Sequence, residues 1–229
     1  MDVAIIGGTG AEGFGLTLRL AKAGHHVTIG SRDAGRAAAK AEEARGILGA
    51  DANVSGAENP AAAAAAPVVI VTVPFEGAAA IYEAIAPVIT PETIVCDCTS
   101  PLMASVGGRA SHALHPWHGS AAEFVRTLLP HGTRLVAGFH TVSAGVLRAL
   151  DKPVDSDTFV MGEDAEAKAT IGSLADDIEG MRWVDLGGLQ MARIAEQMTP
   201  LLISVNVRYK IHDAGFRMTG RDPWGVPQG

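Results

Sequence analysis

Short runs rich in Val, Ile and Ala alternate with longer amphipathic segments along most of the chain. Several of the short runs are almost continuously apolar, as in parallel strands that are covered on both faces of a sheet. Strands are predicted at residues 2–7, 26–30, 68–73, 93–97, 134–139, 158–161 and 183–186. Helices are predicted between them, at residues 11–23, 33–48, 61–66, 76–86, 120–129 and 165–178. This alternation indicates right-handed crossovers and an α/β, doubly wound, mostly parallel sheet.

A long amphipathic helix is predicted over residues 189–211, in a smaller and mainly helical C-terminal region. Pro200 lies inside it and is expected to kink the helix or to mark its restart. The apolar stripe of this helix is predicted to consist of Met191, Ile194, Met198, Leu202 and Val205.

Composition narrows the class of protein. The chain has 229 residues and a formal charge of −7, which argues against a nucleic-acid partner or an anionic membrane surface. No charged leader precedes an apolar run, and no stretch reaches the roughly 20 apolar residues of a membrane-spanning helix. Cys96 and Cys98 alternate along one strand and are predicted to be buried reduced thiols. We therefore expect a cytoplasmic protein.

The first candidate site is the stretch GGTGAEGFG, in which Gly8, Gly10 and Gly13 fit the pattern G-x-G-x-x-G. A strand precedes the stretch and a helix follows it, which is the context of a dinucleotide-binding turn. Gly8 is expected to permit the tight turn and Gly10 the approach of a pyrophosphate, while Gly13 lets the helix meet the strand. Free N–H groups at the start of the helix then face the phosphates.

The end of the second strand indicates which dinucleotide binds. NAD-preferring sites place a carboxylate there, whereas this chain has Ser31 and Arg32. A hydroxyl and a guanidinium suit a 2′-phosphate, and Arg36 adds a second positive charge one turn later. Asp33 is expected to cap the following helix. We predict NADP(H) as the cofactor, with an ordinary surface arginine as the alternative for Arg32.

The strand at residues 68–73 should lead into the ligand crevice with Val73 and Pro74 at its carboxyl end. Phe75 either presents a flat surface near the nicotinamide or packs as a core residue. The polar residues 97–101 end the next strand and are expected to face the same crevice or to cap a turn.

The sequence resembles the NADPH-dependent reductases of the deazaflavin coenzyme F420. The resemblance runs from residue 4 to about residue 206, through the segments AIIGGTGAEGFGLTLRLAKAGH, IGSRDAGRAAAKA, VTVPFEGA, GSAAEFV, AGFHTVSA and RIAEQMTPLLISVN. It implies an oxidoreductase that transfers a hydride between NADP(H) and F420, the second substrate. It also implies a cleft completed by the C-terminal region, and a homodimer.

The resemblance assigns residues to each ligand. The dinucleotide would contact Gly8, Thr9, Gly10, Ala11, Glu12, Gly13, Ser31, Arg32, Arg36, Val73, Pro74 and Phe75. The deazaflavin cleft would contain His140, Ser143, Ala144, Arg193, Glu196, Gln197 and Thr199. His140 is the candidate catalytic residue: it would hydrogen-bond the polar edge of the deazaflavin and stabilise the charge gathering there. The alternative is a strand-end histidine that is satisfied by backbone.

We expect residues 1–141 to form the dinucleotide-binding domain and residues 142–229 to complete the cleft and the dimer contact. No metal is predicted, because Pro116 interrupts the helical geometry that the spacing of His112, His115 and His118 would need.

Two other functions stay open at this stage. One is NADPH-dependent reduction of a small carbonyl or imine, with Tyr209 or Lys210 as the proton donor. The other is a non-catalytic NADPH-binding regulatory module.

Overall fold

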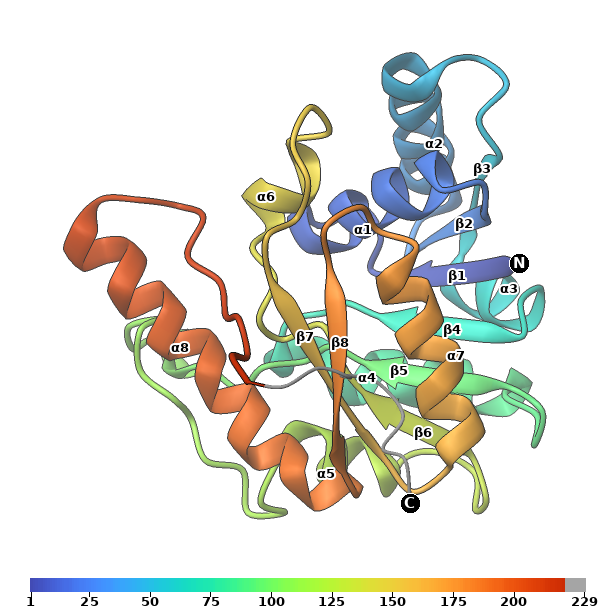
Figure 1. Cartoon of the computed structure of the whole chain (residues 1–229). Helices are drawn as coiled ribbons and strands as arrows, with labels where there is room; N and C mark the ends of the chain where they lie inside the picture. The colour runs from blue at the N-terminus through green and yellow to red at the C-terminus, as the bar shows by residue number, and fades with distance from the viewer. Residues whose placement is uncertain (221–229) are drawn as a thin grey trace.

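The computed structural model describes residues 1–220, and these contain an eight-stranded sheet (Figure 1). The strands lie in the order β3-β2-β1-β4-β5-β6-β7-β8. Strands β1 to β6 are parallel, β7 is antiparallel to β6, and β8 is parallel to β7. The predicted mostly parallel, doubly wound sheet is therefore confirmed. The strands are β1 (Asp2–Ile6), β2 (His26–Ser31), β3 (Val54–Glu58), β4 (Val68–Val71), β5 (Ile94–Asp97), β6 (Arg134–Ala137), β7 (Asp157–Gly162) and β8 (Arg182–Gly187).

The hydrophobic pattern of the sequence did not predict strand β3. Strand β3 has the sequence VSGAE, in which Val54 is the single large apolar residue. The strand lies at the edge of the described sheet, next to β2. Such a short segment carries little hydrophobic signal. The alanine run that follows forms the short helix α3 (Asn59–Ala64), as predicted, with Pro60 in its first turn.

Helices cover both faces of the sheet and bury two separate apolar cores. On one face lie α1 (Ala11–Lys22), α2 (Ala34–Leu48), α6 (Ala144–Arg148) and α7 (Ala165–Asp176). On the other lie α3, α4 (Phe75–Ile85), α5 (Ala121–Arg126) and α8 (Ala192–Tyr209). Three short 3₁₀ turns complete the described elements: η1 (Ala86–Val88), η2 (Met103–Val106) and η3 (Leu189–Met191). Two-sided coverage accounts for the nearly continuous apolar strands.

Helix α8 continues through Pro200 without interruption, so the predicted restart there is wrong. The predicted stripe is also wrong at Ile194, which is 51% exposed. The buried residues of the helix are mostly small, and they are Ala192, Ala195, Glu196, Pro200 and Leu202. Neither α8, with 18 residues, nor any other helix within residues 1–220 has the length and hydropathy to cross a bilayer.

Cys96 and Cys98 lie on and just after β5, and both are buried and free, as predicted. Both belong to the same apolar core, which is consistent with their alternate positions along extended chain.

Candidate functional site

The glycine turn between β1 and α1 has the predicted location, but the roles of its individual glycines differ from the prediction. Gly7, and not Gly8, adopts the left-handed conformation of the turn, with φ +77°. A Cβ on Gly8 would lie 2.8 Å from the carbonyl oxygen of Ile5, so this glycine is required for close packing. A Cβ on Gly13 would lie 2.4 Å from Oγ1 of Thr72. Gly13 therefore lets α1 approach the end of β4 closely, as expected.

The first turn of α1 is open to an anion. Gly10 is its N-cap and has no side chain, and no side chain within residues 1–220 caps the N–H groups there. Ala11 is exposed and Glu12 is half-buried. Burial raises the pKa of the Glu12 carboxyl to about 8, and the charge of Asp97 adds to this shift. At neutral pH Glu12 is mostly protonated, so it does not repel a phosphate.

A cavity of about 370 Å³ opens beside this turn. It is lined by Gly7, Thr9, Gly10, Ser31, Arg32, Arg36, Asn59, Thr72, Val73, Pro74, Glu76, Gly77, Ala80 and Ile81. The structure thus brings seven of the predicted dinucleotide residues together around one space: Thr9, Gly10, Ser31, Arg32, Arg36, Val73 and Pro74. Gly8, Ala11, Glu12 and Gly13 belong to the adjoining turn and helix but do not line the cavity.

Positive charge is available at this cavity. Arg32 and Arg36 are both exposed, and within residues 1–220 neither guanidinium pairs with a carboxylate. Asp33 does not neutralise them through an ion pair, because its carboxylate caps α2 and accepts from the N–H of Arg36 at 2.7 Å. The predicted capping role of Asp33 is confirmed. The hydroxyl of Ser31 completes a set that suits a doubly charged phosphate.

Seven residues that line the cavity were not predicted as site residues: Gly7, Asn59, Thr72, Glu76, Gly77, Ala80 and Ile81. Asn59 is 3% exposed, and its Oδ1 has no hydrogen-bond partner within the described chain. Thr72 donates its hydroxyl to the carbonyl of Ile6 at 3.1 Å. Asn59 lies directly after β3, the strand that the hydrophobic pattern did not predict, so no signal pointed to it.

Phe75 packs against another aromatic ring. Its ring lies 6.0 Å from that of Phe124 on α5, with an interplanar angle of 64°. It does not line the 370 Å³ cavity, so its position favours the packing interpretation.

A second cavity, of about 220 Å³, lies where the chain leaves β6. It is lined by His140, Thr141, Val142, Ser143, Ala144, Thr199, Leu202, Ile203, Asn206 and Ala214. Four residues predicted for the second ligand therefore gather there: His140, Ser143, Ala144 and Thr199. Arg193 and Gln197 do not line this cavity: both are exposed, and Arg193 pairs with Glu123 at 2.9 Å.

His140 is 5% exposed, and neither ring nitrogen has a hydrogen-bond partner within the described residues. The backbone of Thr99 is the polar group that approaches the ring, so the interpretation of His140 as a strand-end histidine stays open. Burial lowers the pKa of His140 to about 4, with a smaller opposing contribution from the nearby backbone of Thr99. The imidazole is neutral at physiological pH and acts as one donor and one acceptor rather than as a cation.

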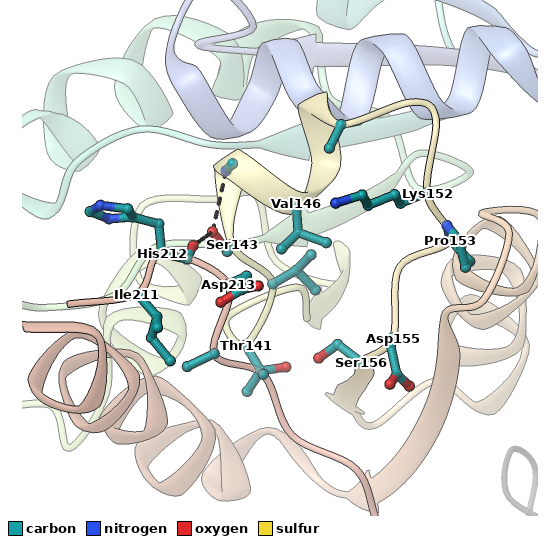
Figure 2. Close-up of a pocket in the computed structure, with 15 residues that line it drawn as sticks. Thr141, Ser143, Val146, Lys152, Pro153, Asp155, Ser156, Ile211, His212 and Asp213 are labelled. Atoms are coloured by element: carbon teal, nitrogen blue, oxygen red, sulfur yellow. Dashed lines mark hydrogen bonds between the residues drawn. The ribbon is translucent and has the colours of Figure 1, made fainter. Parts of the chain in front are cut away.

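A neighbouring cavity of about 550 Å³ shares Thr141, Val142, Ser143 and Ala214 with the second cavity. Figure 2 shows its lining from three segments: the region around α6, the start of β7 and the residues that follow α8. Ser143 Oγ donates to the carbonyl of His212 at 2.7 Å and joins two of these walls.

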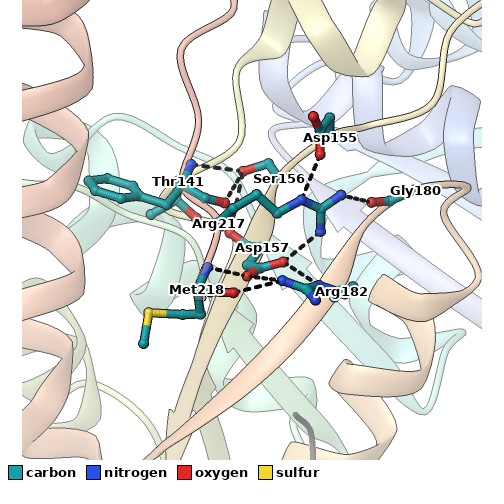
Figure 3. Close-up of polar contacts among 9 residues, drawn as sticks. Thr141, Asp155, Ser156, Asp157, Gly180, Arg182, Arg217 and Met218 are labelled. Atoms are coloured by element: carbon teal, nitrogen blue, oxygen red, sulfur yellow. Dashed lines mark hydrogen bonds and ion pairs between the residues drawn. The ribbon is translucent and has the colours of Figure 1, made fainter. Parts of the chain in front are cut away.

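The segment after α8 is held in place by charge (Figure 3). Asp157 is fully buried at the start of β7 and accepts hydrogen bonds from Arg182, Arg217 and the N–H of Met218 at 2.6–2.8 Å. Burial alone would raise the pKa of Asp157, but these hydrogen bonds outweigh it and lower the pKa. The wall of the 550 Å³ cavity is thus tied to the sheet.

Residues proposed for the alternative carbonyl or imine chemistry lie away from these cavities. Tyr209 is 68% exposed at the end of α8, and Lys210 follows it in the left-handed conformation. Neither lines the 370 Å³ or the 220 Å³ cavity.

Comparison with solved structures places the fold. The chain matches a putative F420-dependent NADP-reductase from Arthrobacter sp. FB24 with a TM-score of 0.80 and 27% identity, covering 96% of this chain and 100% of that one. An imine reductase from Streptomyces aurantiacus matches with a TM-score of 0.60 and 19% identity, covering 90% of this chain and 61% of that one. The second likeness shows a shared fold alone.

Comparison of sequences gives the family. The F420-dependent NADP reductase of Methanothermobacter thermautotrophicus is 42% identical over 221 residues, covering 96% of this chain and 95% of that protein. The protein of the same name from Methanocaldococcus jannaschii is 40% identical over 222 residues, covering 96% and 98%. The family model described as NADP oxidoreductase, coenzyme F420-dependent, matches residues 2–101. The chain therefore belongs to the coenzyme F420-dependent NADP oxidoreductase family.

Proposed function

We propose that this chain transfers a hydride between NADP(H) and the deazaflavin coenzyme F420. One observation carries the dinucleotide half of the proposal. The 370 Å³ cavity beside the glycine turn is lined by Ser31, Arg32 and Arg36. The two guanidinium groups have no acidic partner in the described chain. An NADP 2′-phosphate supplies the charge that this set lacks.

The residues fit the rest of the dinucleotide in the same way. Gly10 and the first turn of α1 offer uncapped N–H groups to a pyrophosphate. Val73 and Pro74 border the cavity at the carboxyl end of β4, next to the β1–β4 boundary where the strand order changes direction. Ligands of doubly wound sheets bind at such a switch point. Bound there, NADPH supplies the hydride.

The second substrate is assigned to the 220 Å³ cavity. His140, Ser143, Ala144 and Thr199 line it, and family membership supplies the identity of F420. In this arrangement the chain itself binds and orients two flat ring systems and keeps water from between them. Neutral His140 is placed to hydrogen-bond a polar edge of the second ring.

The test is to mix purified protein with NADPH and oxidised F420 and to follow the long-wavelength absorbance of the deazaflavin. Bleaching that depends on both NADPH and protein supports the proposal. Binding of NADPH without bleaching contradicts it and favours a regulatory module. Oxidation of NADPH by a small carbonyl or imine, but not by F420, favours the other alternative.

Cofactor choice is tested with Arg32→Ala. Loss of a charge-assisted contact of roughly 1.5–3 kcal/mol should raise KM for NADPH by about 10-fold to 100-fold and leave KM for NADH nearly unchanged. An equal rise for both dinucleotides would remove Arg32 from the 2′-phosphate site. Arg208→Ala is the matched control, because Arg208 is exposed near the end of α8 and lines none of the cavities described above.

We also propose that residues 1–141 bind the dinucleotide. We propose that residues 142–229, of which 221–229 lie outside the described residues, complete the second cavity and form a homodimer contact in the cytoplasm. Residues after 141 supply most of the lining of the 220 Å³ cavity. Large apolar side chains exposed on α8 and just after it support the dimer contact: Ile194, Leu201, Val207, Tyr209 and Ile211. Leu201→Glu with Val207→Glu should convert a dimer to a monomer in analytical ultracentrifugation, and an unchanged mass would contradict this interface.

A further inference from the structure

Three polar side chains from distant parts of the sequence meet beneath the second cavity. Asp97 ends β5, His140 follows β6, and Glu196 lies in the first half of α8. They are 0%, 5% and 2% exposed, respectively. One polar atom from each lies within 4.8 Å of the other two. Because β5 and β6 are parallel neighbours, their carboxyl ends meet at the same edge, where α8 packs over them.

Asp97 and His140 present unsatisfied atoms to this shared space. Oδ1 of Asp97 accepts from the hydroxyls of Tyr82 and Thr99, each at 2.7 Å, whereas its Oδ2 has no partner within residues 1–220. Both ring nitrogens of His140 are also without partners there. Buried polar atoms are nearly always hydrogen-bonded, so these atoms call for a functional explanation.

Glu196 is held rigidly by backbone. Its two carboxyl oxygens accept from the N–H groups of Ala121 and Ala122 at 2.8 and 3.1 Å. These contacts fix the carboxyl group at the start of α5 and leave lone pairs of both oxygens for a further partner.

The surroundings of the cluster are acidic or neutral. The titratable groups that face it are Glu12 from α1, Tyr82 from α4, Cys98 after β5, and Glu123 from α5, which pairs with Arg193. Burial raises the pKa of Asp97 to about 6 and that of Glu196 to about 8. At neutral pH Glu196 therefore holds a proton and Asp97 is mostly ionised, and the imidazole of His140, which lines the cavity, is neutral.

The proposed reduction of F420 by NADPH consumes a proton, which the site must supply. NADPH and oxidised F420 are converted to NADP⁺ and reduced F420 only if one proton is consumed. The C–H bond of the nicotinamide breaks with its electron pair and a new C–H bond forms on the deazaflavin. The added electrons make a ring nitrogen of the acceptor basic, and the proton binds there.

We propose, resting on the proposed function, that Glu196 and Asp97 store this proton and that His140 delivers it to the second cavity. The polar atoms of the cluster lie within 4.8 Å of one another but are not directly hydrogen-bonded, so the proton passes from the carboxyl side to one imidazole nitrogen through a bridging water. The other nitrogen releases a proton toward the ligand, so the ring ends as it began. In the reverse direction the same path returns the proton to the carboxylates. Asp97 and Glu196 act through His140, which alone of the three lines the cavity.

The experiment compares Glu196→Gln with the wild type in two measurements. The first is infrared spectroscopy of the free protein across pH, which detects the carbonyl stretch of a protonated buried carboxyl group. The second is the pH profile of kcat for NADPH-driven F420 reduction, with the solvent deuterium isotope effect. Glu166→Gln is the matched control, since Glu166 is exposed on α7 across the sheet.

In the wild type we expect protonated-carboxyl absorption at pH 7 that titrates away near pH 8. Glu12 contributes to this absorption, and the band of Glu196 is the part that is missing in Glu196→Gln. We expect kcat to fall by about 10-fold or more in that variant, to lose its dependence on a group titrating near pH 8, and to show a larger solvent isotope effect. Absence of the band in the wild type overturns the proposal. A lower kcat of Glu196→Gln with an unchanged pH profile also overturns the proposal, because it indicates that Glu196 has a structural role.

Failure of the relay is distinguishable from failure of the proposed function. A wild type that shows the band but does not bleach F420 overturns the function, and the relay with it. A wild type that bleaches F420 without the band, or with a Glu196→Gln variant of normal profile, overturns the relay alone. Should Glu196→Gln fail to fold, Asp97→Asn supplies the second variant. Its titration near pH 8 should move to lower pH, because the charge of Asp97 contributes to the raised pKa of Glu196, and an unmoved profile overturns the relay.

Discussion

The hydroxyl of Thr199 on α8 donates a hydrogen bond of 2.8 Å to the backbone carbonyl of His140. The same hydroxyl lies 2.7 Å from that of Ser100, just after β5. One side chain thus joins the last helix to the loops that follow two central strands. Because His140 and Thr199 both line the 220 Å³ cavity, the shape of that cavity depends on this connection.

Thr199→Val removes both hydrogen bonds and leaves a buried carbonyl without its donor. We expect a loss of about 1–3 kcal/mol in the free energy of unfolding and a higher KM for F420, with KM for NADPH nearly unchanged. Thermal unfolding and steady-state kinetics with each coenzyme varied in turn measure these effects. Thr199→Ser keeps the hydroxyl and should restore most of both. If the two KM values rise together, Thr199 does not act on the second cavity alone.

Replacing Asn59 should affect the melting temperature of the protein and its KM for NADPH differently. Its Oδ1 is buried without a partner in the described chain, so Asn59→Leu removes an unsatisfied acceptor and should leave the melting temperature of the free protein unchanged or higher. If Oδ1 accepts a donor of the dinucleotide, KM for NADPH should rise about fivefold to tenfold, the equivalent of roughly 1 kcal/mol. Asn53→Leu, at an exposed position, should change neither. An unaltered KM in Asn59→Leu would rule out the contact.

Two glycine substitutions should have opposite signs. In Gly13→Ala the new Cβ meets Thr72 Oγ1 at 2.4 Å and Gly8 Cα at 2.8 Å, and backbone cannot move aside cheaply. We expect a loss of about 1–3 kcal/mol in stability and weaker NADPH binding. In Gly46→Ala, on α2, no atom of residues 1–220 lies within 4 Å of the new Cβ, so helix propensity should raise stability by roughly 0.5–1 kcal/mol. Chemical denaturation measures both, and equal effects would contradict the packing argument.

Local patterns in the sequence predicted every described strand except β3, and half of the residues that line the 370 Å³ cavity. Apolar runs indicated β1, β2 and β4, and the glycine spacing lay between a strand and a helix, where such turns occur. Ser31 and Arg32 follow directly from their place at the end of β2. In each case the signal and its structural consequence lie within a few residues of each other.

Features that depend on distant contacts could not be predicted in this way. Glycine spacing did not reveal that Gly7, rather than Gly8, takes the positive φ. The cluster of Asp97, His140 and Glu196 forms only when β5, β6 and α8 are assembled, and no spacing joins those positions. Antiparallel pairing of β7 with β6 is likewise a tertiary property.

Asp157 should make stability depend on acid pH. Its pKa is lowered in the folded chain, so its contribution is present above the ordinary value of 3.8 and is lost as pH falls through the native pKa. Asp157→Asn should therefore unfold at a lower temperature at pH 7, and the difference from wild type should shrink toward pH 3. Asp155→Asn, with a side chain that is 86% exposed, should show a much smaller difference. Circular dichroism melts across this range decide the matter, because a difference independent of pH would mean that packing, not charge, ties the C-terminal segment to β7.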